Sequence, residues 1–173
     1  MNTTITKLLF VFTLLVTFKS YGQETNTESS VQKVYSEDFE ILLGDWTGGL
    51  TYIDYSSKKP FSMPANLTVT QGKNKNQFVL NFIYPNEPKA NSKDKILVSK
   101  SGDKLNDKVV KSKRVLSNGN VEIITEYEGK DNNEKALIRN VYLVASNQFV
   151  IIKEVKFEKS NDWLKRNEYN FNK

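Results

Sequence analysis

The chain has 173 residues and contains neither cysteine nor histidine. Without these residue types it cannot form disulfides, thiolate nucleophiles, metal sites built from imidazole or thiolate, or catalytic triads that need a histidine base. Its formal net charge of +5 is mild and falls short of the concentrated basic patch that nucleic-acid binding requires. We therefore expect no metal, no cofactor and no nucleic-acid partner.

Residues 1–22 have the pattern of an export signal. Lys7 precedes an apolar stretch, Leu8–Phe18, which is shorter than the about 20 apolar residues that a membrane-spanning helix needs. We predict cleavage after Gly22. Removal of Lys7 and Lys19 leaves 23 basic and 20 acidic residues, a mature charge of +3. The end of this segment resembles export signals of the Bacteroidetes, which implies a periplasmic or extracellular protein without a membrane span.

Two short segments precede the predicted sheet. Residues 23–35 carry few apolar side chains, so we predict a disordered leader. Residues 36–43 open with Ser36 as a capping hydroxyl, continue with acids and an apolar face, and stop at Gly44, which predicts one or two helical turns. We expect residues 36–173 to form one domain, because a mature chain of about 150 residues supplies one core.

From Trp46 onward, apolar and polar residues alternate, which is the period of half-buried strands. Segments rich in turn-forming residues separate the runs, and none has the pattern of a crossover helix. Eight to ten short strands in succession must hide their edges, and a closed meander does so completely. We therefore predict an all-β fold, an antiparallel up-and-down barrel. A sandwich is the alternative, but it usually needs longer Greek-key connections.

Two turns predict strand register. Asn118 and Gly119 tolerate positive φ and suit a two-residue type I′ hairpin turn. Counting outward from that turn predicts three pairs: Leu116 with Val121, Arg114 with Ile123, and Ser112 with Thr125. The same count from Ser146 and Asn147 predicts three more: Tyr142 with Ile151, Asn140 with Lys153, and Ile138 with Val155.

Residues 39–54 resemble the start of lipocalins and other calycins. A short helical turn leads into Gly44, Asp45 and Trp46 and then into an alternating strand. In that family the tryptophan plugs the closed end of the barrel, and an arginine from the last strand lies across its ring. The resemblance therefore implies a lipocalin-like barrel closed by Gly44, Trp46 and Arg166, the arginine of the last predicted strand. Cation–π attraction gives that contact a physical reason.

The same opening also resembles that of nitrobindin-type haem barrels. Those proteins ligate haem through a histidine near the C-terminus, and this chain has none. Haem binding of that kind therefore does not carry over.

Polar residues on strand faces that should otherwise be apolar form the candidate ligand site. They are Tyr52, Asp54, Arg114, Asn140, Tyr142 and Lys153. In an apolar cavity they would be the few convergent polar groups typical of a small-ligand site, and Arg114 or Lys153 would meet an acidic head group. The alternative is structural: counting across the Ser160 turn places Lys153 opposite Glu168 as a cross-strand ion pair.

We predict an exported monomer that binds a small hydrophobic or amphipathic molecule and is not an enzyme. The first alternative is a filled barrel that binds a protein or a surface polymer through its outside. The second is a histidine-free carboxylate enzyme, for which Asp54, Glu126 and Glu168 are available, although their spacing does not bring them together.

Overall fold

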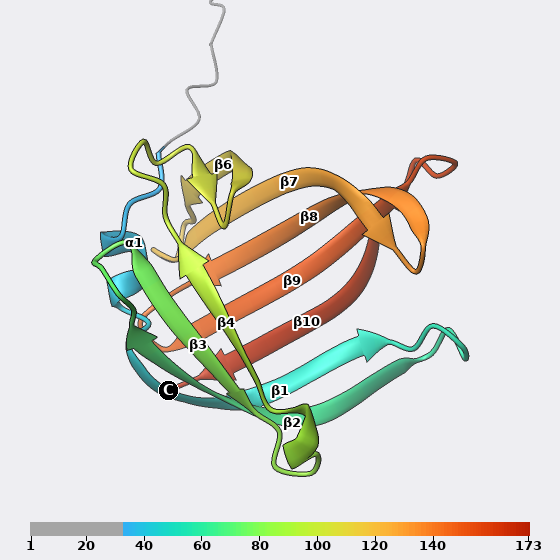
Figure 1. Cartoon of the computed structure of the whole chain (residues 1–173), viewed down its shortest axis with the longest axis horizontal. Helices are drawn as coiled ribbons and strands as arrows, with labels where there is room; N and C mark the ends of the chain where they lie inside the picture. Colours follow the sequence, from blue (N-terminus) through green and yellow to red (C-terminus); the bar gives the residue numbers. More distant parts are fainter. Residues whose placement is uncertain (1–32) are drawn as a thin grey trace, which may run out of the picture.

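The computed structural model describes residues 33–173 as a nearly closed, ten-stranded antiparallel barrel with one short α-helix (Figure 1). The predicted signal peptide and residues 23–32 of the predicted leader lie outside the described residues. Among the described residues, no helix has the length and apolar character needed to cross a membrane.

The helices and strands follow one another in a simple meander. In chain order they are α1 (Glu37–Glu40), β1 (Gly44–Ile53), β2 (Pro60–Gln71), β3 (Gln77–Ile83), the 3₁₀ turn η1 (Pro88–Ala90), β4 (Ser92–Leu97), β5 (Lys104–Leu105), β6 (Lys108–Val115), β7 (Val121–Asp131), β8 (Glu134–Val144), β9 (Gln148–Phe157) and β10 (Leu164–Asn172).

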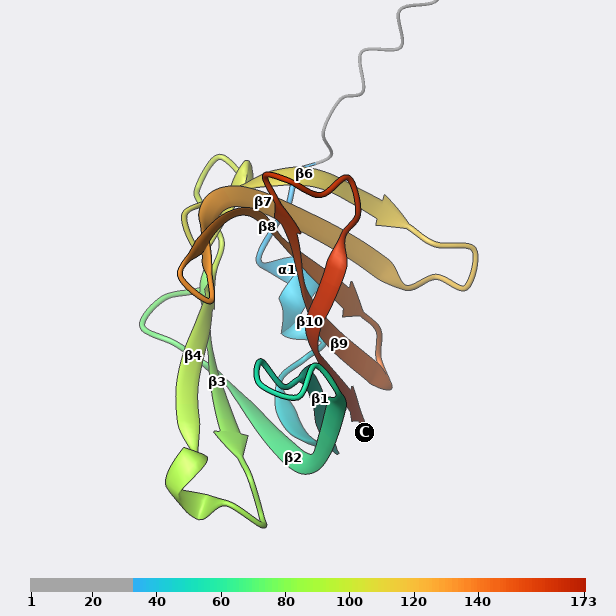
Figure 2. The same cartoon turned by 90° about the vertical axis from the view of Figure 1, so that its right-hand side faces the viewer.

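The barrel closes by pairing its first strand with its last. The strand order is β4-β3-β2-β1-β10-β9-β8-β7-β6-β5. Strands that follow one another in sequence are paired, except β4 and β5, which form the two ends of the order, and β1 also pairs with β10. A single bridge between Val98 and Leu105 joins the two ends of this order. Beyond that bridge β4 and β6 run away from each other (Figure 2). The predicted antiparallel meander is confirmed, with this one seam left partly open.

The β8–β9 hairpin has the predicted register. Tyr142 pairs with Ile151 and Asn140 with Lys153, on either side of the turn at Ser146. Ala145 N–H donates to the Gln148 carbonyl at 2.9 Å and closes the turn over two residues. All three pairs predicted from this turn are confirmed.

The β6–β7 hairpin is shifted by one residue from the prediction. Leu116 N–H donates to the Asn120 carbonyl at 2.8 Å, and Gly119 N–H donates to the Leu116 carbonyl at 2.9 Å. Gly119 has φ +83°, whereas Asn118 is not among the positive-φ residues. The loop therefore has three residues, the type I turn followed by a left-handed glycine. One extra loop residue turns the β6 side chains between the loop and Ser112 to the other face, so Arg114 lies opposite Glu122 instead of Ile123. A bulge between Val110 and Ser112 ends this shift, and Val110 again points inward opposite Thr125.

Replacing Gly119 by alanine should lower the free energy of unfolding by about 1 kcal/mol, the cost of holding an L-residue in the left-handed region. No atom lies within 4 Å of the position that the new Cβ would take, so the effect comes from the backbone alone. The control is Ser117→Ala in the same loop, which should change it by less than about 0.5 kcal/mol. Urea denaturation measures both, and equal values for the two variants would contradict this turn geometry.

The β9–β10 register also departs from the prediction. A bulge between Lys165 and Asn167 sets Asn167 opposite Lys153, and Glu168 lies opposite Ile152. Glu168 instead accepts a bond from Lys165 Nζ at 2.6 Å. The predicted Lys153–Glu168 ion pair is therefore wrong. Beside the turn, Leu164 pairs with Val155, two residues from the predicted pairing, and the bulge then changes the offset by one, which puts Glu168 on the other face from Lys153.

One end of the barrel, here called the base, is sealed by α1 and the aromatic residues beneath it. Phe39, Leu42 and Trp46 are almost completely buried. Trp46 Nε1 donates to the Leu42 carbonyl at 2.7 Å, and its ring lies 6.3 Å from that of Phe149. Gly44, with φ +114°, ends the helical segment and begins β1. Trp46 thus fills the base.

The residues just before α1 belong to the folded domain. Val34 is fully buried, and its N–H donates to the Gly102 carbonyl at 2.9 Å. The predicted disordered leader, residues 23–35, is therefore wrong for residues 33–35, which are part of the folded domain. Ser36 also departs from its predicted capping role: its hydroxyl donates to the Glu37 carboxylate, and the α1 N-cap has no side-chain hydrogen bond.

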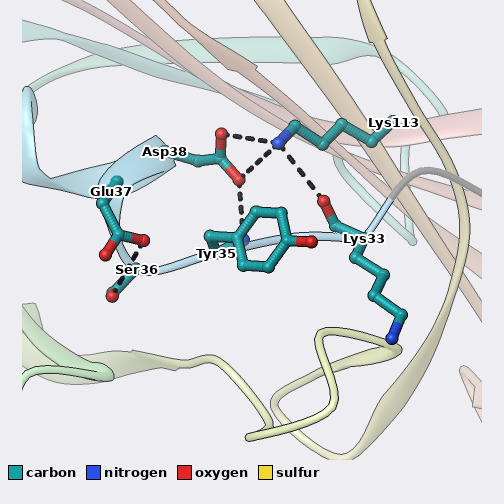
Figure 3. Close-up of polar contacts among 6 residues, drawn as sticks. All are labelled: Lys33, Tyr35, Ser36, Glu37, Asp38 and Lys113. Carbon is teal, nitrogen blue, oxygen red and sulfur yellow. Dashed lines mark hydrogen bonds and ion pairs between the residues drawn. The ribbon is translucent and has the colours of Figure 1, made fainter.

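A lysine of β6 anchors this segment to the barrel wall (Figure 3). Lys113 Nζ contacts the Asp38 carboxylate at 2.7 Å and donates to the Lys33 carbonyl at 3.2 Å. The same carboxylate accepts the Tyr35 N–H at 2.7 Å. Lys113 lies opposite the buried Ile123, so the shifted β6 register turns Lys113 inward in place of Arg114. Lys113 therefore holds the segment before α1 at the base.

Candidate functional site

The barrel interior changes from apolar to polar along its axis. Near the base, inward side chains such as Phe78, Phe149 and Phe171 are fully buried. Farther from the base, Leu50, Met63 and Ile151 still pack against this core but remain partly exposed. Solvent therefore reaches these three inward side chains, whereas it does not reach the inward side chains near the base.

Three of the predicted site residues lie in one row across the inner wall. Asn140 pairs with Lys153, Lys153 with Asn167, and Asn167 with Tyr52. Thr125 extends the row by pairing with Asn140. Directly paired residues point to the same face of a sheet, so five strands present polar side chains inward at one level. We call this row, Thr125, Asn140, Lys153, Asn167 and Tyr52, the polar belt.

The polar belt separates two apolar regions. The main core lies on the base side, and a smaller cluster of Ala136, Ile138 and Val155 lies on the other. Within the belt the Thr125 hydroxyl is buried and has no hydrogen-bond partner among the described residues. A buried polar group without a partner costs free energy, so the belt has unused hydrogen-bonding capacity.

A charged cluster lies at the opposite end from the base, which we call the mouth and which the β1–β2, β7–β8 and β9–β10 turns surround (Figure 1). Asp131, the last residue of β7, is 3% exposed. Its Oδ1 accepts bonds from the Tyr55 hydroxyl and from Lys153 Nζ, both at 2.8 Å. Its Oδ2 lies 3.0 Å from Arg166 Nε. We call Tyr55, Asp131, Lys153 and Arg166 the mouth cluster, and Lys153 belongs to both it and the belt.

Arg166 does not contact Trp46, so the predicted barrel-closing pair is wrong. The Arg166 guanidinium lies 3.7 Å above the Tyr55 ring, and Lys173 Nζ lies 4.7 Å above the Trp46 ring. The reason is position along β10. Thr47, beside Trp46, pairs with Asn172 at the base, whereas Arg166 lies at the β10 bulge near the mouth.

The electrostatics of the mouth cluster leave an unbalanced positive charge. Lys153 and Arg166 carry two positive charges against the single carboxylate of Asp131. Burial opposes ionisation of Asp131, but hydrogen bonds from Lys153 and Tyr55 and the two nearby cations outweigh it and hold the pKa of Asp131 below its ordinary value. Burial and the bond to Asp131 raise the pKa of the Tyr55 hydroxyl.

Arg166 keeps unused donors although it is only 5% exposed. Its Nε is close to Asp131 but not aligned for a hydrogen bond, and neither Nε nor Nη2 has a hydrogen-bond partner among the described residues. A pocket of about 200 Å³ adjoins this side chain. Its lining residues are Ile53, Tyr55, Lys58, Asn132, Glu134, Phe157, Leu164 and Arg166. A larger groove of about 620 Å³ shares Phe157 but includes neither the belt nor Arg166.

The other predicted site residues lie elsewhere. Arg114 points outward and is bonded to Glu122 at 2.6 Å, with its side chain 65% exposed. Asp54 lies in the β1–β2 turn, where its carboxylate accepts the Ser57 N–H at 2.7 Å, a bond that lowers its pKa. Both assignments to an interior site are wrong. Tyr142 points inward within the core, and burial raises its pKa.

Asp131, Asn167 and Tyr55 are site residues that the sequence patterns did not indicate, and Arg166 has a role other than the predicted one. Asn167 could not be placed on the inner face, because counting strand pairs outward from the turn does not reveal the bulge beside it. Asp131 comes at the end of a strand before a turn, where an aspartate usually serves the turn itself. A signal was nevertheless present: Thr125, Tyr127 and Asp131 share the inward parity of β7.

No family model and no curated protein matches the chain. Among solved structures, it is similar to a protein of unknown function of the DUF3598 family from Nostoc punctiforme, with a TM-score of 0.38 and 9% identity over 82% of this chain. The chain spans about half, 49%, of that protein's length. A likeness at this TM-score carries no functional argument.

Proposed function

We propose that this protein is an exported binding protein for a small amphipathic molecule, which lies inside the barrel with its apolar part toward the base. The observation that carries this proposal is the polar belt, which crosses five strands of the inner wall between a sealed apolar base and an open mouth. An apolar surface with a few convergent polar groups is the usual design of a small-ligand site.

The apolar part of such a ligand would contact the partly exposed inner residues Leu50, Met63 and Ile151. Burial of apolar surface contributes about 25 cal/mol per Å², so covering these side chains supplies a favourable term for binding. The polar end would then reach the belt, where the half-buried Lys153 and the unpartnered Thr125 hydroxyl offer hydrogen bonds.

We propose binding without turnover. Asp131 is the only carboxylate among the buried residues of the described chain, and it already accepts bonds from Tyr55 and Lys153. A carboxylate held in this way by two cations and a phenol is stabilised as the anion and is poorly suited to act as a general acid or base near neutral pH.

Two neighbouring residues provide the test of the proposed function. Ile151 points inward and Ile152 outward, and both are partly exposed. Ile151→Trp should fill the interior and weaken binding of a dansyl-labelled fatty acid about tenfold or more, because an extra ring in the ligand volume costs at least about 1.4 kcal/mol. Ile152→Trp should leave binding unchanged. Fluorescence titration measures both, with circular dichroism as the check on folding.

The second candidate function is partner binding through the outer wall. The outward faces of β7, β8 and β9 carry an apolar row, Ile124, Val141 and Ile152, beside which Leu143 and Val150 pair. Val141 and Val150 are buried, so the partly exposed members are Ile124, Leu143 and Ile152. If Ile152→Trp abolished probe binding and Ile151→Trp did not, the probe site would be this outer face, and the interior site would be rejected.

A further inference from the structure

We infer that the mouth cluster is the binding site for a monoanionic head group of the carboxylate type, held by Arg166 and Lys153. This inference rests on the proposed function, which supplies the apolar part of the ligand. The inference adds the chemical class of the head group. It also identifies Arg166 and Asp131 as the residues that select which head-group charge the site binds.

The mouth cluster carries more positive than negative charge. Lys153, Asp131 and Arg166 together carry one net positive charge, with side chains 29%, 1% and 5% exposed. The pocket beside Arg166 has two other charged lining residues, Lys58 and Glu134, and their opposite charges cancel. A partly desolvated positive charge without a counter-ion is costly. One bound anion would neutralise it.

The Arg166 guanidinium keeps a free donor. Its Nη2 has no hydrogen-bond partner among the described residues, whereas Nε faces the Asp131 carboxylate at 3.0 Å. Nη2 can therefore donate to a bound carboxylate while Nε stays beside Asp131. The Tyr55 ring lies against the face of the same group at 3.7 Å, which fixes the guanidinium plane and does not cover Nη2. The pocket of about 200 Å³ beside Arg166 has room for such a head group.

Asp131 sets the selectivity for charge. A single negative charge on the ligand balances the cluster, whereas a doubly charged phosphate monoester would leave one negative charge in excess beside the Asp131 carboxylate. Asp131 therefore limits the site to monoanions and keeps Lys153 and Arg166 in place when the site is empty.

The test compares one fluorescent fatty acid with its methyl ester. The wild-type protein should bind the acid about tenfold more tightly than the ester, as expected for hydrogen bonds to a charged group. Lys153→Gln should remove most of that difference, because it should lower the affinity for the acid and leave the affinity for the ester unchanged. The matched control is Lys156→Gln, which replaces the outward-pointing lysine three residues along β9 and should affect neither ligand.

Asp131→Asn provides a gain of affinity that a purely structural role would not produce. Removing the internal counter-ion raises the cluster charge by one unit, so the acid should bind several-fold more tightly at low salt while the ester does not change. If this variant does not fold, the Lys153→Gln comparison alone decides the inference.

The outcomes separate the two proposals. Equal binding of acid and ester to the wild type, together with no effect of Lys153→Gln, would overturn the head-group inference and leave the amphipathic binding function standing. Failure of both ligands to bind would overturn the binding function and the inference with it. Weaker acid binding by a folded Asp131→Asn variant would also overturn the inference, because Asp131 would then be helping the ligand to bind.

Discussion

Replacing Trp46 by alanine should lower the free energy of unfolding by about 3–5 kcal/mol, the usual cost of truncating a large aromatic core residue. Trp46 is 1% exposed and packs against Phe149 beneath α1. Its removal would leave a cavity at the base and would also remove the bond from Nε1 to the Leu42 carbonyl, which holds the residues after α1 onto the barrel. Urea unfolding followed by far-UV circular dichroism measures the loss without relying on tryptophan fluorescence.

The chain contains its own control in Trp163, the second tryptophan. Trp163 is only partly buried and lies 3.9 Å from the Arg139 guanidinium outside the core. Trp163→Ala should therefore cost about 1 kcal/mol or less, the value of an exposed cation–π contact. A Trp46→Ala protein that melts within a degree of the wild type would show that the base is not held by this side chain.

The contrast between Trp46 and Arg166 shows how far a sequence can place residues in this fold. Trp46 could be placed because the helical turn and Gly44 beside it carry the resemblance to lipocalins, which implies a tryptophan at the closed end of the barrel. Arg166 was assigned to the correct strand but to the wrong end of it, because its contacts are with Tyr55 and Asp131, which are distant in sequence. Local patterns predict the strands, and contacts between distant strands decide the site.

Register errors explain most of the remaining differences. The two-residue β8–β9 turn gave the correct pairs, and these placed Asn140 beside Lys153. The β6–β7 loop has one more residue than predicted, because Gly119 alone takes the left-handed conformation. That single residue turned Arg114 out of the interior and Lys113 into it. In a strand protein an error of one residue exchanges the inner and outer faces, so half of a candidate site can be lost to one turn.

The apolar and polar layers of the interior were partly predictable from the alternation. The sequence analysis identified Tyr52, Asn140 and Lys153 as polar residues on otherwise apolar faces, and the structure places all three in the polar belt. It could not show the mouth cluster, because Asp131 and Tyr55 lie 76 residues apart and meet only when the barrel closes. An inward charged residue can be part of a binding site only if other strands bring polar side chains to it, and these strands meet only in the closed barrel.

Replacing Asp131 by asparagine should lower the free energy of unfolding at neutral pH by about 3–5 kcal/mol, because Arg166 would be left buried without its counter-charge. The loss should depend on pH in a definite direction. The pKa of Asp131 is depressed in the folded protein, so its stabilising effect is complete above the pKa of the unfolded state, about 4, and disappears as the pH falls through the folded value. The stability difference between wild type and variant should therefore shrink below about pH 4.

Urea midpoints measured from neutral to acid pH test this linkage. The control is Asp103→Asn, since Asp103 is an exposed carboxylate whose pKa is also lowered, by hydrogen bonds from Ser101 and Ser99 rather than by buried cations. Its replacement should produce a much smaller loss at neutral pH. A difference between wild type and Asp131→Asn that stays constant down to acid pH would mean that the ionised carboxylate does not hold the cluster. The charge balance proposed for the mouth would then have to be abandoned, because Arg166 and Lys153 would be stabilised without Asp131.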